Sequence, residues 1–230
     1  MKDSLRESGR HVFGRTLRGV GVHGGPPGAS QLYFAALLSQ RVMVGGRLGM
    51  ALRRLRTIAG PDEFDHVRVA RYPSQGSLSA LRCSPLLLAM GPLQRRGVSG
   101  LQISLGSVTQ APGDWREVRA AWVLTDQAHE RSRALCALLG GHSHLGGSCA
   151  FEATLNALPP HPLTASVPPP LQATSLSVLA FPSVRLALDA LALPEVTRFL
   201  AQTAGPAGIR GELGWALMER VSLREMLTPG

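Results

Sequence analysis

The sequence lacks most of the features that assign a chain to a class at first sight. It has one lysine, Lys2, among its 24 basic residues, three cysteines, and only 5% aromatic residues. Its longest apolar runs, such as 86–90 and 187–193, are much shorter than the roughly 20 residues of a membrane-spanning helix. The N-terminal segment MKDSLRESGR has no apolar core of the kind found in a secretory signal. We therefore expect a cytoplasmic protein with no membrane partner.

The familiar catalytic and nucleotide-binding motifs are missing as well. The chain has no GxSxG nucleophile motif, no P-loop, no HExxH zinc motif and no dinucleotide-binding glycine fingerprint. Its cysteines, Cys83, Cys136 and Cys149, are odd in number and form no CxxC pair. This usage is typical of reduced thiols in a reducing compartment, and the simplest interpretation is three small buried hydrophobic residues.

A net charge of +9 would ordinarily indicate a polyanion as partner. However, the chain is rich in Ala, Gly, Pro and Leu, a bias that a GC-rich coding sequence also produces together with arginine. Its one cluster, Arg47, Arg53, Arg54 and Arg56, lacks the interleaved aromatic residues that bind single-stranded nucleic acid. We interpret the cluster as a solvated strand face, with a surface for phosphate or another anion as the alternative. We do not expect nucleic acid as a partner.

An internal repeat is the most informative feature that is present. YPS at 72–74 matches FPS at 181–183 with an offset of 109 residues, and Pro85 falls on Pro194 at the same offset. Upstream, ALLSQRVMVGG at 36–46 lies over ALLGGHSHLGG at 137–147 with an offset of 101, which also aligns Arg18 with Arg119. The two offsets differ by a proline-rich insertion near 158–172, which is unsuited to a central strand.

Each half reads as the same order of elements, βαββαβ. The first half predicts strands at 16–23, 50–58, 65–72 and 101–108, a helix at 31–42, and a helix after Ser74 that restarts at Pro85. The second predicts strands at 117–125, 148–155, 175–181 and 211–220, and helices at 127–139 and 184–204. We assign residues 1–110 to the first repeat, with an N-terminal extension, and residues 111–230 to the second.

This order predicts an α+β fold with a four-stranded antiparallel sheet per repeat and both helices on one face. The other face of each sheet needs a cover, and two repeats in one chain supply it for each other. We therefore expect two ferredoxin-like repeats packed sheet to sheet as an intramolecular dimeric α/β barrel. The barrel is a pseudo-dimer within one chain, and a further homodimer stays open.

The segments FDHVRVA at 64–70 and RYPSQGSLSALRCSP at 71–85 resemble the dimeric α/β-barrel superfamily, most closely the family called domain of unknown function 1330. There a strand of the kind V-V-E-Y-P-S leads into a helix that restarts with Asp-Pro-Glu-Tyr. This chain has SPLL at 84–87 and LPEV at 193–196, so that only Glu195 keeps an acid. The resemblance implies the functions of a superfamily that includes small monooxygenases, isomerases, dehydratases and cyclases acting on aromatic or lactone substrates, besides members with no known activity.

The strand at 65–72 carries the main candidates for a site. By period-2 alternation His66 shares a face with Arg68, Ala70 and Tyr72. A histidine with a tyrosine and an arginine nearby can transfer protons on a carbonyl or phenol substrate inside a barrel. We name His66 and Tyr72 as catalytic candidates and Arg68 as a ligand-binding one. The alternative is a histidine at a strand edge with a local hydrogen bond.

Two further candidates are Arg18 and Arg119, which the repeat places at equivalent positions of the two first strands. Paired arginines at the mouth of a pseudo-twofold cavity can hold a carboxylate through two hydrogen bonds each. They are equally well explained as surface residues at strand edges.

The segment GHSHLGGSC at 141–149 places His142, His144 and Cys149 close together and invites a metal interpretation. No fourth ligand follows at a suitable spacing, and the equivalent segment of the first half has no ligand. We therefore expect a solvated loop and no metal.

The sequence thus leaves two functions open. One is a cofactor-independent enzyme of the monooxygenase, isomerase or cyclase type acting on a small oxygenated hydrophobic molecule. The other is a non-catalytic small-molecule-binding or scaffold protein with a degenerate site. The space between the sheets separates them, because an apolar filling favours the scaffold and an open cavity reached by His66 or the arginines favours the ligand site.

Overall fold

The computed structural model describes residues 11–17, 29–60, 64–93, 100–110, 118–126, 130–157, 175–203, 214–222 and 224–225. The first repeat contains strands β1 (His11–Leu17), β2 (Arg47–Ala59), β3 (Phe64–Arg71) and β4 (Gly100–Gln110), with helices α1 (Ala29–Met43), α2 (Gln75–Arg82) and α3 (Pro85–Ala89). The second contains strands β5 (Ala120–Asp126), β6 (Ser148–Ala157), β7 (Ser175–Phe181) and β8 (Gly214–Arg220), helices α5 (Glu130–Gly140), α6 (Val184–Leu191) and α7 (Pro194–Thr203), and a 3-10 turn, η1 (Ser143–Leu145).

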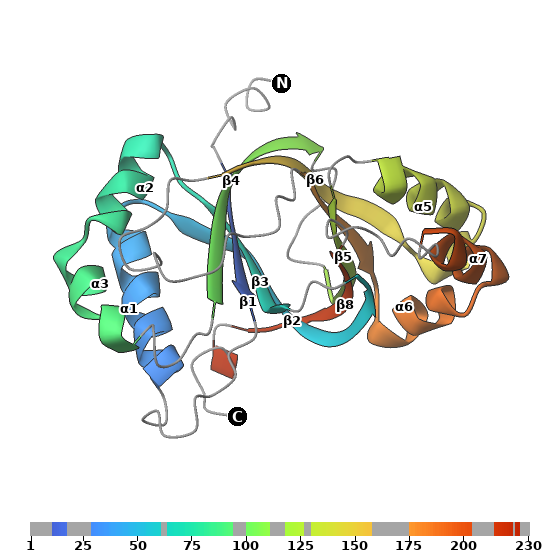
Figure 1. Cartoon of the computed structure of the whole chain (residues 1–230), viewed down its shortest axis with the longest axis horizontal. Coiled ribbons are helices and arrows are strands. Elements are labelled where there is room, and N and C mark those ends of the chain that lie inside the picture. The colour runs from blue at the N-terminus through green and yellow to red at the C-terminus, as the bar shows by residue number, and fades with distance from the viewer. Residues whose placement is uncertain are drawn as a thin grey trace, which may run out of the picture.

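The eight strands form one closed antiparallel barrel in the order β1-β3-β2-β8-β5-β7-β6-β4. Each repeat contributes four strands in ferredoxin-like order, β4-β1-β3-β2 and β8-β5-β7-β6. The two sheets join through the pairs β2–β8 and β4–β6. Helices α1 to α3 cover one side of the barrel and α5 to α7 the opposite side (Figure 1). The predicted fold, an intramolecular α/β barrel made of two βαββαβ units, is confirmed.

The first strand is the exception among the predicted elements. The sequence predicts it at 16–23, whereas β1 begins at His11 and ends at Leu17. Over this range β1 pairs with both β3 and β4. The segment HVFGRTL carries Val, Phe and Thr, which favour strands, whereas 18–23 adds two glycines, which do not. Residues 18–28 lie outside the described part of the chain, as do the predicted repeat boundary and the proline-rich insertion, so those boundaries stay predictions.

The described side chains that form the buried cluster inside the barrel are apolar. Along β3 the inward positions are Val67 and Val69, and along β2 they are Met50 and Leu52. They belong to one buried cluster that draws on both repeats and also contains Val118, Ala121, Val123, Ala150, Phe151, Ala153, Leu155, Leu176, Val178, Ala216 and Met218. Among the described residues, the space between the two sheets is therefore a packed core.

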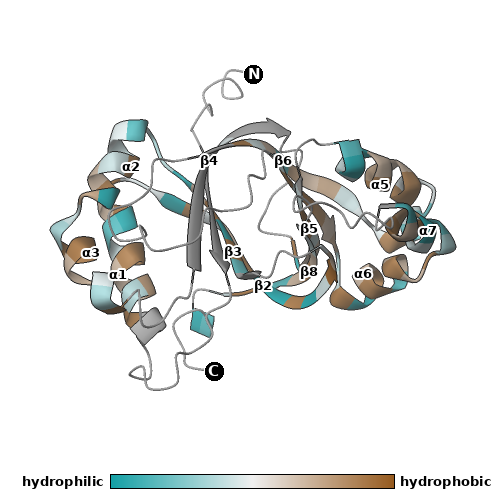
Figure 2. Ribbon diagram, viewed as in Figure 1, coloured by the Kyte–Doolittle hydropathy of each residue, from teal (hydrophilic) through white to brown (hydrophobic). Residues whose placement is uncertain are grey.

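A second and a third core lie between the barrel and its two groups of helices. The layer under α5 to α7 is built around Trp122, Trp215 and Phe181. The layer under α1 to α3 is built around Tyr33, Phe34, Tyr72 and Leu81. The helices of both groups mix apolar residues (brown) with polar ones (teal), as amphipathic helices over a sheet do (Figure 2). No helix in the described ranges is long and apolar enough to cross a membrane.

The repeat seen in the sequence corresponds to matching contacts. Gly45, with φ of 75°, and Gly146, with φ of 68°, lie at the turns that precede β2 and β6, in a conformation that favours glycine. A side chain on Gly45 would meet Pro73, and one on Gly146 would meet Pro182. Each proline is followed by a serine whose hydroxyl caps the next helix. The shared YPS and FPS segments thus have a structural role, in forming the turn contact and capping the helix in each repeat.

The helices α1 and α5, which precede these glycines, align between the repeats with a different residue offset from that of the glycines. A Cβ on Gly46 would contact Arg41 and Tyr72, and a Cβ on Gly147 would contact Leu139 and Phe181. Leu139 is 98 residues after Arg41, whereas Gly147 is 101 residues after Gly46. The difference of three residues is the length of η1, which lies between α5 and Gly146. The glycines were therefore aligned correctly from the sequence, and the helices were aligned three residues out of register.

Candidate functional site

The most unusual polar group in the described structure lies between β3 and α1 in the first repeat. Arg41, on the last turn of α1, is only 6% exposed, and Tyr72, directly after β3, is 2% exposed. The Nε of Arg41 donates a hydrogen bond of 3.0 Å to the hydroxyl oxygen of Tyr72. The Nη1 of Arg41 is buried and has no hydrogen-bond partner. Within the described ranges, Arg41 thus keeps one donor unused inside an apolar layer.

A second arginine lies in the same layer. Arg68 of β3 is 9% exposed, and its guanidinium carbon is 3.8 Å from the centre of the Phe34 ring. This distance is typical of a cation–π contact. Phe34 in turn packs edge to face against Tyr33, with ring centres 5.5 Å apart. We refer to Arg41, Arg68, Tyr33 and Tyr72 together as the arginine–tyrosine cluster.

The members of the cluster act on each other electrostatically. Burial raises the pKa of Tyr33 to about 12, against the opposing effect of the positive charges on Arg41 and Arg68. Burial, followed by the charge of Arg41, lowers the pKa of Arg68 to about 10. Two cations are therefore held in a layer that resists charge, and no contact between Arg41 and a carboxylate is found in the described part of the chain. Such a group is suited to binding an anion.

The local sequence explains how the cluster is positioned. On β3, Val67 and Val69 point into the barrel, so that Arg68 points outward toward the helices. On α1, residues 33, 34, 37 and 41 recur at helical spacing and face the sheet. Gly46 completes the arrangement, because a Cβ at this position would lie 2.7 Å from both Arg41 Cγ and Tyr72 Cε1. Glycine is thus needed for the close approach of the two side chains.

This placement corrects one expectation for the site. His66, Arg68 and Tyr72 do share a face of β3, but that face lies under the helices, and the prediction that it lines the inside of the barrel is wrong. His66 is six residues before Tyr72, which is about 20 Å along an extended strand. The two proposed catalytic residues therefore cannot act on the same atom. Their catalytic roles stay predictions, with Tyr72 in the cluster and His66 outside it.

Of the two arginines that the repeat pairs, Arg18 and Arg119, the structure describes Arg119. Arg119 comes directly before β5, where its backbone oxygen accepts a hydrogen bond of 3.0 Å from the amide of Arg220. Its side chain is exposed. Arg18 lies outside the described residues and follows the last residue of β1 in sequence. Since only Arg119 is described, the pairing of Arg18 with Arg119 as a carboxylate site stays a prediction.

The histidine-rich loop at 141–149 and the arginine-rich strand β2 were the two other candidate sites. The rings of His142 and His144 are 5.9 Å apart at η1, and no group of three candidate metal ligands is found in the described ranges. On β2, Arg53 forms an ion pair with Glu219 of β8, and Arg54 donates to the Thr57 hydroxyl at 3.0 Å. These two arginines have partners of their own, and the anion surface at 47–56 stays a prediction.

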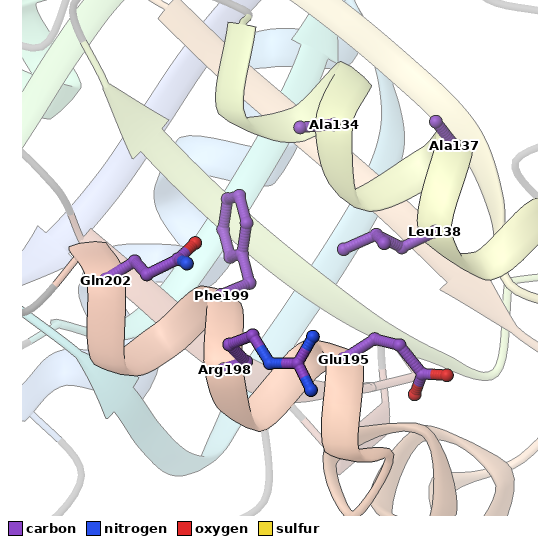
Figure 3. A pocket seen from close by; sticks show the side chains of 7 residues that line it. All are labelled: Ala134, Ala137, Leu138, Glu195, Arg198, Phe199 and Gln202. Atoms are coloured by element: carbon purple, nitrogen blue, oxygen red, sulfur yellow. The ribbon is translucent and has the colours of Figure 1, made fainter.

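A shallow groove of about 550 Å³ lies between α5 and α7 in the second repeat (Figure 3). Leu138 and Phe199 form its apolar part, and Glu195, Arg198 and Gln202 its polar part, with Ala134 and Ala137 completing the lining. Glu195 is the acid that the family pattern would retain, and its carboxylate is 3.8 Å from His142 Nε2. The groove is open and its polar groups are solvated, so it exerts less chemical constraint on a ligand than the arginine–tyrosine cluster does.

Sequence reasoning found half of the cluster. Arg68 and Tyr72 were named from the alternation of one strand, whereas Arg41 and Tyr33 were missed because they come from α1. The signal that was available is the count of tyrosines: the chain has only two, and both lie in this layer.

Comparisons with known proteins support the fold. No family model matches the sequence, and no curated protein is similar to it. The structure is similar to a solved anthrone oxidase-like protein, with a TM-score of 0.51 at 10% identity over 94% of this chain and 93% of the other. A mutant chlorite dismutase from Candidatus Nitrospira defluvii in complex with cyanide also matches, with a TM-score of 0.46 at 13% identity over 97% and 95% of the two chains. The dimeric α/β-barrel fold is confirmed, and the narrower resemblance to domain of unknown function 1330 stays a prediction.

Proposed function

We propose that the protein binds a small hydrophobic molecule through an anionic oxygen at the arginine–tyrosine cluster, and that it oxidises this molecule as a cofactor-independent enzyme of the monooxygenase type. The observation that carries the proposal is the buried Nη1 of Arg41, which has no partner among the described residues. A buried donor of this kind costs free energy in the empty protein. A ligand that supplies an oxygen anion would remove that cost.

The chemistry follows from the charges. A phenol or an enolisable ketone loses a proton to become a phenolate or enolate, and a positively charged, water-poor site favours the ionised form. Arg41 Nη1 would donate to the oxygen anion. Tyr72 accepts from Arg41 Nε, which leaves its own hydroxyl proton free to donate to the same oxygen. Tyr33 and Phe34 would contact the apolar part of the ligand.

The oxidation needs only molecular oxygen as co-reactant. For an anthrone-type ligand, the deprotonated ring carbon reacts with O2, and its CH2 group becomes a carbonyl while water leaves. Atoms balance because the two hydrogens and one oxygen atom form the water and the other oxygen atom stays on carbon. The fold shared with an anthrone oxidase-like protein supports this choice of substrate class.

The second candidate is a binding protein without catalysis. The buried apolar cluster between the sheets favours it, because the described inward side chains offer a substrate no polar group there. The restriction of the cluster to one repeat also favours it. The two functions share the anion site and differ only in the consumption of oxygen.

The test is oxygen uptake with anthrone as substrate and no added cofactor, together with calorimetric binding of 2-naphthoate and its neutral analogue 2-naphthylmethanol. We expect anthraquinone formation with one O2 consumed per anthrone, and tighter binding of the naphthoate than of the alcohol. The double variant Arg41→Leu/Tyr72→Phe carries the residues found in the second repeat and should lower kcat/KM by about 100-fold or more. It should also stabilise the empty protein, because apolar side chains replace a buried charge.

The matched control is Leu139→Met in the second repeat, which changes a residue at the equivalent position without altering charge and should leave both measurements unchanged. Naphthoate binding that depends on Arg41 without any oxygen uptake would identify the binding protein. Equal binding of naphthoate to the wild type and the double variant would refute the anion site.

A further inference from the structure

The second repeat holds a different polar group in its own sheet–helix layer. Glu152 of β6 pairs in register with Ser177 of β7, as Ala51 of β2 pairs with Arg68 of β3. Glu152 is 2% exposed and accepts a hydrogen bond of 3.1 Å from the hydroxyl of Ser132 on α5. Next to it are two thiols, Cys136 of α5 and Cys149 of β6, both reduced and partly exposed.

The two thiols lie close enough across the layer for each to shift the pKa of the other, which is lowered for Cys136 and raised for Cys149. The architecture supports this contact independently. With the helix register established above, Cys136 is equivalent to Leu38, and Cys149 is equivalent to Leu48. In the first repeat Leu38 and Leu48 both pack against the cluster of Ala51 and Val221, in which Ala51 is the equivalent of Glu152. The fold therefore brings these two positions to the same small cluster in the first repeat, where they are leucines, and we infer the same neighbourhood for the thiols of the second.

We propose that Cys136 and Cys149 are a site of reversible oxidation, at which a peroxide converts the two thiols to a disulfide that links α5 to β6. In the first step the Cys136 thiolate attacks one oxygen of hydrogen peroxide, the O–O bond breaks, and Cys136 becomes a sulfenic acid as water leaves. In the second step the sulfur of Cys149 attacks the sulfur of Cys136, and the hydroxyl group leaves as a second water. The two thiols lose two electrons and two protons in total, and the peroxide is reduced to two waters.

The environment assigns the order of the two sulfurs. The interaction with Cys149 lowers the pKa of Cys136, and the proposal therefore takes Cys136 as the sulfur that ionises and attacks first. The same interaction, together with burial, raises the pKa of Cys149 well above its usual range. Glu152 opposes ionisation of both thiols. Arg133, whose Nη2 is 3.9 Å from the Glu152 carboxylate, offsets part of that negative charge.

Cys83 provides an internal reference. It is the third cysteine of the chain, is exposed at the end of α2, and has no second thiol beside it within the described ranges. It can form a sulfenic acid or a bridge between two molecules, but no disulfide within the chain. Replacing it by serine removes the bridge between molecules and leaves the proposed site unchanged.

The experiment treats the full-length Cys83→Ser protein with hydrogen peroxide and measures the intact mass and the disulfide-linked peptides. We expect the loss of two hydrogens per chain, a peptide in which Cys136 is joined to Cys149, and full reversal by dithiothreitol. Adding Cys149→Ser should stop the reaction at a sulfenic acid on Cys136 that dimedone traps. Adding Cys136→Ser should leave Cys149 largely unlabelled.

Oxidation of both thiols to sulfinic acids without a bridge would overturn the proposal, as would equal dimedone labelling of Cys136 and Cys149 in the two single variants. The peptide map of the Cys83→Ser protein needs no change in the layer itself, so the proposal can be refuted even if a variant at Cys136 or Cys149 fails to fold. Because the cluster of the first repeat takes no part, these results are independent of the proposed anion site.

Discussion

In the first repeat, Arg41 lies under Gly46 and is hydrogen-bonded to Tyr72. In the second repeat, Leu139 lies under Gly147 and is packed near Phe181. The glycine, the proline and the capping serine around these residues are the same in both repeats. The chemistry of the two layers has diverged on a common backbone. The turn, the cap and the close approach are therefore requirements of the fold, whereas the buried charge is not.

The difference extends to the sign of the buried charge. The strand pair Ala51–Arg68 carries a cation in the first repeat, and the equivalent pair Glu152–Ser177 carries a carboxyl group in the second. Phe34 of α1 covers the cation, and Ser132 of α5 donates to the carboxylate. The two related layers thus bury groups of opposite charge. We propose anion binding at the arginines of the first layer and oxidation at the two thiols of the second, where the carboxylate itself opposes thiol ionisation.

An arginine placed in the second layer tests most directly whether the two layers differ in their tolerance of a buried cation. Leu139 is 1% exposed and packs in the cluster that contains Trp122 and Phe181. Leu139→Arg puts a charge where no tyrosine hydroxyl is available, because Phe181 replaces Tyr72. We expect a loss of about 3–5 kcal/mol in the free energy of unfolding, measured by urea denaturation.

The control for this variant is Leu139→Met, which keeps the volume and should cost less than about 1.5 kcal/mol. The double variant Leu139→Arg/Phe181→Tyr restores the hydroxyl partner and should recover part of the loss. If Leu139→Arg folds with wild-type stability, the second layer tolerates a buried cation as well as the first does, and the contrast between the repeats is lost.

The tyrosines provide an optical probe of the first layer. Both tyrosines of the chain, Tyr33 and Tyr72, lie in the first layer, so the ultraviolet absorbance of tyrosinate reports on that layer alone. In Tyr72→Phe only Tyr33 titrates. Burial raises its pKa to about 12, and we expect the absorbance at alkaline pH to rise about two pH units later in the folded protein than in urea.

The linked effect on stability has a defined sign. Since the pKa of Tyr33 is higher in the folded state, its contribution to stability is fully present below about pH 10 and is lost as the pH rises to about 12, with a total of roughly 3 kcal/mol. The pKa of Arg68 is lowered to about 10, so Arg68 contributes in the opposite direction over the same range. The optical titration separates the two, and a transition near pH 10 in the folded Tyr72→Phe protein would contradict the burial of Tyr33.

The fold was largely predictable because the residues that begin and end its helices and strands act locally. Prolines, capping serines and helix-ending glycines act within a few residues, and they marked the elements of both repeats from Arg47 onward. The first strand was misplaced because alternation alone does not fix where a strand begins, and the pairing with β3 and β4 that does fix it is not local. The helix register was wrong by three residues because η1 has no counterpart in the first repeat.

The site was less predictable for a related reason. Alternation along β3 correctly grouped Arg68 with Tyr72, but it cannot say which face is covered by helices when Val67, Val69 and Ala70 make both faces apolar. Alternation also says nothing of how far apart two residues on one face lie, so that His66 was grouped with Tyr72, about 20 Å away along the strand. Arg41 meets Tyr72 only through the docking of α1 on the sheet. A contact of this kind depends on tertiary packing.

The last prediction, with the smallest expected effect, concerns the helix-capping serines that the two repeats share. Ser74 accepts a hydrogen bond of 3.0 Å from the amide of Ser77, and Ser183 accepts one of 3.2 Å from the amide of Leu186, with nearly the same backbone angles. Ser74→Ala and Ser183→Ala should each lower the free energy of unfolding by about 1 kcal/mol, because each leaves a helix amide without its partner.

Ser79→Ala is the matched control, since Ser79 is exposed within α2 and its side chain caps nothing; alanine there should be neutral or slightly stabilising. Equal losses at Ser74 and Ser183 would mean that the two repeats are still energetically equivalent where their sequences agree. A loss of stability in only one of the two serine variants would mean that the helix caps shared by the repeats have diverged in strength as well. In that case the functional difference between the layers could not be attributed to the substituted side chains alone.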